Sequence, residues 1–464
     1  MNDRALRAQP PLEFIPPALN PLVLSSAQIV LPMWLQWKTN IASIQADRVE
    51  ILADLYHQFQ QGKIRFLMAF RHPNTDDPYC MAYLLWKLLP QVARKQGISL
   101  SLPIHAHFIY DRGIPLWAGT RVGWLYSQLG GTPIQRGKID LMGLRSARQL
   151  FAEGMLPMAA APEGATNGHN EIVSPIEPGI SQLGFWCVED LQKAQRSQEV
   201  FIIPIGIQYR YVTPPWKEIE KLLTQLEMDV GLNTRQNVEQ QTAESLYDNV
   251  LGQRLYRLGE HLLSIMEEFY REFYHQTLPK PTEISQSNKE AILSIRLQNL
   301  LNVALQVAEE YFALPAKGNV IDRCRRLEQA GWDYIYREEL KSSHKLSTVE
   351  RGLADRVAEE ANLRVWHMRL VESFVAVTGY YVKEKPTAER FAETTLLLSD
   401  CITRIKGGNP FFRPHLGQQQ VQMTISEPIS ISARWADYQK NRRQAIATLT
   451  QDLQGVLEST ISFI

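Results

Sequence analysis

The sequence has little cysteine and no excess of charge of either sign, and both absences exclude classes of protein. Its 464 residues include four cysteines, and no two of them form a CxxC motif. Scattered cysteines favour buried thiols in a reducing compartment over a disulfide framework. Lys and Arg number 49, as do Asp and Glu, so the net charge is zero. The overall charge therefore does not point to nucleic acid, and any anion site has to be local.

Several common catalytic signatures are also missing. The sequence contains no Walker loop, no GxGxxG and no Gly-x-Ser-x-Gly, so nucleotide-binding loops and a serine-hydrolase elbow are not supported. His105 and His107 alternate along one expected strand, but no third ligand lies near them in the sequence. Core or surface histidines are therefore favoured over a metal site, and we expect no metal or bound cofactor.

The beginning of the chain has no pattern of a secretory signal, because polar residues rather than an apolar stretch follow Met1. Residues 14–37 carry no charge, but prolines and polar residues interrupt their apolar run. A spanning helix needs ~20 predominantly apolar residues. We interpret residues 14–37 either as a buried element, such as a core helix, or as an interfacial foot beside Trp34 and Trp37.

Between residues 45 and 212 the pattern alternates between strands and helices. The expected strands are 64–70, 105–110, 155–161 and 200–209. The expected helices are 47–60, 78–95, 118–130, 144–153 and 181–196. This alternation predicts an α/β fold, with a mixed, mostly parallel sheet flanked by helices.

Beyond Pro215 the pattern becomes helical. The expected helices are 216–227, 235–276, 290–313, 347–379, a helix from Pro386 to the glycines at 407–408, and 434–460. Ser347 and Glu350 suit a capping box, and residues 421–432 suit a short hairpin or edge strand. These patterns divide the chain into three regions: a Pro-rich apolar segment over 1–44, an α/β domain over 45–215 and a mostly helical region over 216–464.

A histidine and a carboxylate stand together where the first expected strand meets a helix. His72 and Asp77 are separated by four residues, after the strand 64–70 and before a helix. A carboxylate that reaches the imidazole fixes its tautomer and raises its basicity, so the histidine can take a proton from an alcohol. Asp77 before Pro78 also suits a helix N-cap, and Asp76 competes for the imidazole.

Three later segments carry further polar chemistry. Gly131 to Arg136 is a glycine-rich turn whose Arg136 could bind a phosphate, or it is a solvated basic loop. The loop with Glu163, Gly164, Thr166 and Asn167 could cradle an oxyanion, or it is an ordinary turn. Glu163 would repel phosphate, so it suits substrate hydroxyls, or nearby cations and loop amides.

The fourth segment is the expected strand 200–209. Pro204 is awkward in a central strand, and Gly206 leaves room for a close approach.

In order and spacing, the four segments resemble the motifs of the glycerolipid acyltransferases, the lysophosphatidic acid and glycerol-3-phosphate acyltransferase superfamily. His72 to Asp77 is similar to the His-x4-Asp motif, and Gly131 to Arg136 to the second motif. Pro162-Glu163-Gly164 with Thr166 is similar to the third motif, and Ile203-Pro204-Ile205 to the fourth. The resemblance covers roughly residues 45–215. Departures include Arg71, where the family commonly has Asn.

The resemblance implies direct transfer of an acyl group from acyl-CoA or acyl-carrier protein, as co-substrate, to a glycerol-phosphate-type hydroxyl. His72, oriented by Asp77, would be the general base. Arg136, with Gly164, Thr166 and Asn167, would hold the acceptor phosphate, and Glu163 would orient the acceptor or the loop. The strand with Pro204 would line the acyl groove.

Three functions remain open at this stage. The favoured one is a phospholipid-forming acyltransferase, cytoplasmic and in peripheral contact with a membrane, whose acceptor is a lysophospholipid such as 1-acylglycerol-3-phosphate. The others are a non-catalytic lipid-binding or scaffold protein on the same fold, and a thioester hydrolase that uses the His-Asp pair on water.

Overall fold

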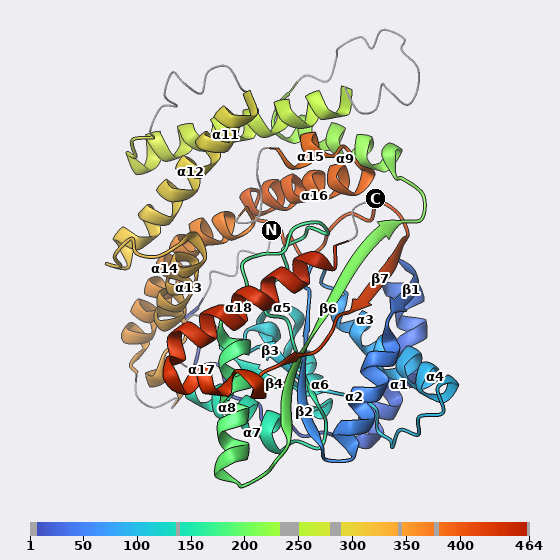
Figure 1. Ribbon diagram of the computed structural model, residues 1–464. Helices are drawn as coiled ribbons and strands as arrows, with labels where there is room; N and C mark the ends of the chain where they lie inside the picture. The colour runs from blue at the N-terminus through green and yellow to red at the C-terminus, as the bar shows by residue number, and fades with distance from the viewer. Residues whose placement is uncertain are drawn as a thin grey trace. The chain divides into compact units, whose positions relative to one another are not determined.

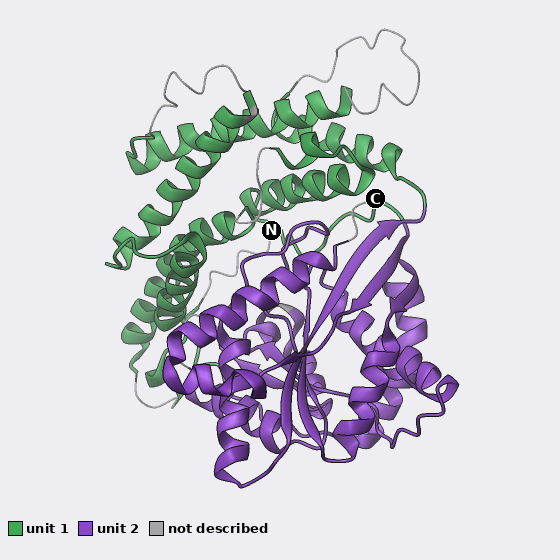
Figure 2. Ribbon diagram, viewed as in Figure 1, with its two compact units in different colours: residues 1–12, 213–417 green, residues 13–212, 418–464 purple. Residues whose placement is uncertain are grey.

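The computed structural model describes residues 7–135, 140–232, 250–278, 289–341, 346–374 and 380–461. The chain divides into two compact units (Figure 2). One unit comprises residues Met1–Leu12 and Thr213–Gly417 and is helical. The other comprises Glu13–Val212 and Gln418–Ile464 and contains the sheet.

This division differs from the sequence-based boundaries, which placed residues 216–464 in one region. Residues 418–464 belong to the sheet unit, because strand β7 (Gln419–Ile425) pairs in parallel with β1 (Ile41–Asp47). On its other side β7 pairs antiparallel with β6 (Glu199–Tyr211). The segment expected as a hairpin or edge strand therefore supplies an interior strand, and β1 is a strand that the sequence did not predict.

The sheet is mixed and mostly parallel, as the sequence predicted. Its strand order over the described residues is β1-β7-β6-β2-β5-β3-β4, with β8 also paired to β6. The strands from β6 to β4 are parallel to one another, and β7 and β1 run in the opposite direction. The remaining strands are β2 (Ile64–Phe70), β3 (His107–Asp111), β4 (Thr132–Ile134), β5 (Met158–Ala160) and β8 (Ile429–Ser430).

Helices cover both faces of the sheet (Figure 1). On one face lie α1 (Pro21–Lys38), α2 (Val49–Gln60), α3 (Asp77–Tyr83), the π-helical turn η1 (Leu84–Leu88) and α4 (Leu89–Lys95). On the other lie α7 (Leu141–Glu153), α8 (Gly179–Lys193), α17 (Trp435–Lys440) and α18 (Arg442–Ser459). Strand β2 alternates between the two cores, since Phe66 and Met68 face one and Leu67 and Ala69 the other.

Pro204 lies within β6, where a proline costs a ladder hydrogen bond. It pairs with Ala69 of β2, and its carbonyl accepts from the N–H of Ser426, which lies between β7 and β8. The missing N–H therefore faces the interruption between those two strands. This break explains how the sheet interior tolerates a proline.

Gly206 of β6 makes the close approach that the sequence predicted. A Cβ atom at this position would lie 2.4 Å from Oγ1 of Thr460, just beyond α18. Only glycine lets the end of α18 lie this close to the strand.

The helical unit consists of α9 (Trp216–Asp229), α11 (Gly252–Tyr274), α12 (Lys289–Tyr311), α13 (Val320–Ile335), α14 (Thr348–Glu372), α15 (Tyr381–Glu384) and α16 (Ala388–Ile405). The predicted capping box is present, since Ser347 and Glu350 each accept the other's backbone N–H. In the part of the chain that the structure describes, one stretch, Ala291–Tyr311, is long and apolar enough to cross a bilayer. It packs against α11 and α14, as a core helix also does.

Candidate active site

His72 lies just beyond the carboxyl end of β2, between the ends of β5 and β6. In parallel sheets, ligands bind at this edge, because the loops that follow neighbouring strands converge there. Three chain segments meet around His72: residues 71–77 after β2, residues 161–174 after β5, and the last part of β6. The sequence predicted a function for all three segments, but for the β6 strand it predicted a lining of the acyl groove and not a contact with Asp77.

The His72 imidazole is held between two partners. Its Nδ1 lies 2.9 Å from Oδ2 of Asp77, and its Nε2 lies 3.0 Å from the hydroxyl of Thr166. Because the Asp77 carboxylate can only accept, Nδ1 carries the proton and Nε2 is left as the basic nitrogen. The Thr166 hydroxyl therefore donates to Nε2. The imidazole is in the tautomer that a general base requires.

Asp77 is fully buried, and its two oxygens are engaged by three donors. Oδ2 accepts from His72 and from the backbone N–H of Asn74 at 2.9 Å. Oδ1 accepts from the hydroxyl of Tyr209, on β6, at 2.6 Å. Burial raises the pKa of Tyr209 well above its ordinary value, so the phenol remains a donor.

The expectation that Asp77 caps α3 was wrong. Asp77 is the first residue of the helix, and the residue at the N-cap position is Asp76, whose side chain makes no capping hydrogen bond. The Asp77 carboxylate points instead to the imidazole, which removes Asp76 as the competing partner. Burial, and next the charge of Asp77, raise the pKa of Asp76 to about 6.

Glu163 anchors the backbone of the histidine. Its Oε1 accepts the His72 N–H at 2.7 Å, and its Oε2 accepts from the Asn167 side chain and from the Ser174 N–H. The carboxylate is buried, which raises its pKa, and the nearby guanidinium of Arg71 opposes that shift. Of the roles considered for Glu163, the structure shows the one that holds loop amides.

The loop after β5 holds the histidine on its other side as well. The N–H of Asn167 donates to the carbonyl of His72, so the His72 peptide groups are bound on both sides by one loop. Gly164 permits the turn, since its φ is +71° and a Cβ would lie 2.4 Å from Oε1 of Glu177. Thr166 is carried over the imidazole by this turn.

Arg71 fastens the far part of the same loop. Its guanidinium is fully buried and donates to the carbonyls of His169, Asn170 and Ile172. The Asn170 side chain in turn accepts the backbone N–H of Tyr209 at 2.7 Å. Arg71, one of the departures from the acyltransferase motifs, therefore joins the ends of β2 and β6 to the loop after β5.

Sequence reasoning missed Tyr209 and the structural role of Arg71. Tyr209 ends an alternating stripe with Ile203, Ile205 and Ile207 on one face of β6, so it was expected only as part of a strand. The sequence offered one signal for Tyr209: it is a hydroxyl-bearing residue at the end of an apolar stripe, at the same edge of the sheet as the His72 turn.

The remaining candidates lie elsewhere. Arg136 falls outside the described residues, so its place relative to His72 stays a prediction. Pro204 lies inside the sheet, three residues below the level of His72, as its pairing with Ala69 shows. His105 and His107 are buried, and each ring bonds to a backbone carbonyl, of Leu129 and Gly130.

Burial lowers the pKa of both histidines, that of His105 to about 4. Among the described residues, no group of three or more His, Cys, Asp or Glu side chains is arranged to hold a metal ion.

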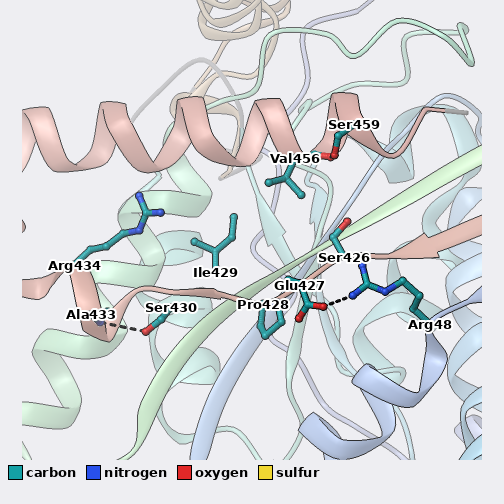
Figure 3. Close-up of a pocket in the computed structure, with 10 residues that line it drawn as sticks. All are labelled: Arg48, Ser426, Glu427, Pro428, Ile429, Ser430, Ala433, Arg434, Val456 and Ser459. Carbon is teal, nitrogen blue, oxygen red and sulfur yellow. Dashed lines mark hydrogen bonds and ion pairs between the residues drawn. The ribbon is translucent and has the colours of Figure 1, made fainter.

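A separate pocket of about 560 Å³ lies beside the turn between β7 and β8 (Figure 3). Its two arginines are already paired, Arg48 with Glu427 and Arg434 with Asp452. None of the residues around His72 lines it, so the pocket does not extend the candidate active site.

The candidate active site therefore consists of a buried carboxylate, an imidazole that the carboxylate orients, and a loop that holds the histidine in place. Over the whole chain, no protein-family model matches, and no curated protein shows significant similarity.

Proposed function

We propose that the protein is an O-acyltransferase that moves a fatty acyl group from a thioester to a glycerol-phosphate-type hydroxyl, with 1-acylglycerol-3-phosphate as the favoured acceptor. The observation that carries the proposal is the hydroxyl of Thr166, 3.0 Å from Nε2 of His72. It marks a position where the basic nitrogen meets an alcohol. The resemblance of the four segments to glycerolipid acyltransferases supports the same chemistry.

In the proposed reaction the acceptor hydroxyl replaces that of Thr166 at Nε2. His72 takes its proton, while Asp77 stabilises the resulting imidazolium. The alkoxide attacks the thioester carbonyl, and backbone amides of the loop after Glu163 stabilise the oxyanion. Collapse expels the thiolate of CoA or acyl-carrier protein, which takes the proton back from His72. The products are an ester and a free thiol.

The acceptor phosphate has to be held by groups other than Arg71, whose guanidinium is buried on backbone carbonyls. Arg136 remains our proposed phosphate ligand, with Gly164 and Thr166. The predicted part of Asn167 is less favoured, because its side-chain N–H groups donate to Glu163 and to the carbonyl of Ile172. Both substrates are amphiphilic, so we also propose a peripheral membrane contact.

The rival activity is thioester hydrolysis, and one contact favours it. Thr166, His72 and Asp77 are joined by successive hydrogen bonds. A nucleophile, a general base and an orienting carboxylate have the same arrangement. In that case the Thr166 oxygen would itself attack the thioester, and water would release the acid.

Three variants separate these activities in an assay of thiol release and lipid product, with acyl-CoA and lysophosphatidic acid. His72→Ala should lower the rate roughly 100- to 10,000-fold, while His57→Ala, on α2, should leave it unchanged. Thr166→Ala should keep most of the transfer activity, because the acceptor supplies the reacting hydroxyl.

A His72→Ala enzyme with full activity would contradict the base mechanism. A Thr166→Ala variant as inactive as His72→Ala, with acceptor-independent thiol release in the wild type, would favour the hydrolase. Wild-type protein that binds lipid without any thiol release would favour the non-catalytic alternative.

A further inference from the structure

Helix α1 is apolar on the side that faces away from its own unit. Its buried side is formed by Leu24, Leu31 and Leu35. On the remaining surface, large apolar side chains are between 41% and 79% exposed: Leu22, Ile29, Val30, Met33, Trp34 and Trp37. Ile29, Met33 and Trp37 recur every four residues, so they form one stripe along the helix.

A helix on the surface of a water-soluble domain normally has a polar outer face. The outer face of α1 instead exposes large apolar side chains, with Leu22 79%, Ile29 75% and Trp37 73% exposed. Contiguous exposed apolar surface of this kind marks a binding face for another molecule or for a membrane.

The charges around the stripe favour an anionic bilayer as the occupant. Helix α1 contains no Asp or Glu, and neither do α5 (Ile114–Ala118) and α6 (Thr120–Gln128). Helix α6 packs against α1 and exposes Trp124. The charged residues of these helices are Lys38 and Arg121, both exposed cations, which attract anionic headgroups.

Helix α1 is also connected to the carboxylate of Asp77, through Trp34. The ring of Trp34 lies 6.0 Å from that of Tyr79, centroid to centroid. Tyr79 belongs to α3, whose first residue is Asp77, and α1 and α3 lie in contact (Figure 1). A surface that seats α1 would therefore lie next to the helix that orients His72.

We propose that the outer face of α1, with Trp124 of α6, docks the sheet unit onto an anionic phospholipid bilayer. Tryptophan suits the headgroup region, and lysine at the end of an apolar helix suits the phosphates above it. The purpose of this docking rests on the proposed function: it would give amphiphilic substrates access to His72. The docking itself needs no turnover and is measured without it.

The test is co-sedimentation of the full chain with vesicles of phosphatidylcholine and phosphatidylglycerol, compared with phosphatidylcholine alone. The variant Ile29→Ser/Met33→Ser/Trp37→Ser should weaken binding about tenfold or more. Lys38→Glu/Arg121→Glu should weaken binding chiefly to the anionic vesicles. All these side chains are exposed, so the fold should be kept, which circular dichroism and thermal unfolding verify.

The matched control is Leu102→Ser/Met142→Ser/Met155→Ser, which removes exposed apolar side chains elsewhere in the same unit. It should bind like the wild type. The inactive His72→Ala protein should also bind normally, so a failure of catalysis and a failure of docking are distinguished.

Wild-type protein that sediments with neither vesicle would overturn the proposal, and so would a stripe variant that binds like the control. A wild-type dimer that the stripe variant converts to a monomer, without vesicle binding, would assign the face to a second copy of the chain.

Discussion

The hydroxyl of Tyr209 lies 2.6 Å from Oδ1 of Asp77, although the two residues are 132 positions apart in the chain. The phenol satisfies the carboxylate oxygen that the imidazole does not use. The thiol of Cys80 lies 3.4 Å from the same hydroxyl and donates to it, because the Tyr209 proton is committed to Asp77. Tyr209 thus acts on His72 through Asp77, as a positioning residue.

Tyr209→Phe should therefore change the pH dependence of catalysis. Without the phenol, the charge of Asp77 is less neutralised and stabilises the His72 imidazolium more strongly. Since the base must be neutral, the acidic limb of kcat/KM should move to higher pH. We also expect kcat to fall about tenfold, equivalent to the loss of one hydrogen bond to a charged group.

The control for this experiment is Tyr56→Phe. Tyr56 is also a fully buried tyrosine, and its hydroxyl donates to the carbonyl of His105 at 2.6 Å. Its removal should lower the free energy of unfolding without moving the pH profile. Identical profiles for Tyr209→Phe and the wild type would exclude the positioning role.

Glu163→Gln should both destabilise the protein and slow it. The carboxylate accepts three N–H donors, and an amide cannot replace it, because its NH2 group would face at least one of them. Removal of the buried charge offsets part of the lost hydrogen bonding. We therefore expect the free energy of unfolding to fall by about 2 kcal/mol. Denaturant titration and kcat together measure both effects. Glu153→Gln, at the exposed end of α7, should leave both values unchanged.

Asp76→Asn should stabilise the protein at neutral and alkaline pH. The folded-state pKa of Asp76, about 6, lies above the value of about 3.9 for an unfolded chain. The folded protein therefore holds a proton that the unfolded chain has lost, and its stability falls as the pH rises through this window.

Asparagine has no charge to bury at this position. We expect Asp76→Asn to raise the free energy of unfolding by about 1 kcal/mol at about pH 8, and by much less at about pH 4. Urea titrations at both pH values measure the difference. The control is Asp54→Asn, at an exposed position of α2, which should change the free energy of unfolding equally at both pH values. An effect of Asp76→Asn that does not depend on pH would contradict the raised pKa of Asp76.

Gly206→Ala should be destabilising, and a second change should relieve it. The new Cβ would lie 2.4 Å and 2.5 Å from Oγ1 and Cβ of Thr460, whose short side chain cannot swing away. We expect a loss of about 2 kcal/mol. In a Thr460→Gly background the same substitution should cost less, and a double-mutant cycle on thermal unfolding measures the coupling. Gly455→Ala, in α18 with open space around it, should not destabilise.

The parts of the fold that the sequence revealed are those with local signals. Strand β2 has the predicted bounds, because the run from Ile64 to Phe70 is apolar except for Arg65 and turns lie on both sides of it. Strand β1 was not predicted, since Ser43 and Gln45 dilute its apolar residues. The interior position of β7 depends on pairing across more than 350 residues of sequence, and no local pattern encodes that register.

The same distinction applies to the site. His72 and Asp77 were predicted together because both lie in one turn, where their spacing is visible. Thr166 lies in the loop after β5 and Tyr209 lies on β6, and only the order of strands in the sheet brings these residues to His72 and Asp77. The helix-cap role suggested for Asp77 failed because Asp77 is the first residue of α3 and both of its oxygens have other partners, Oδ2 the imidazole and the Asn74 amide, and Oδ1 the Tyr209 hydroxyl.

The position of β7 has a consequence for biosynthesis. The central sheet lacks a strand between β1 and β6 until residues 419–425 have been made. On the ribosome, β6 emerges long before its neighbour and waits with an unpaired edge while about 200 residues of helical insertion are translated, at about 5–20 residues per second. The nascent chain thus spends tens of seconds with its sheet open, in the state where a chaperone, or premature association with another chain, would act on it.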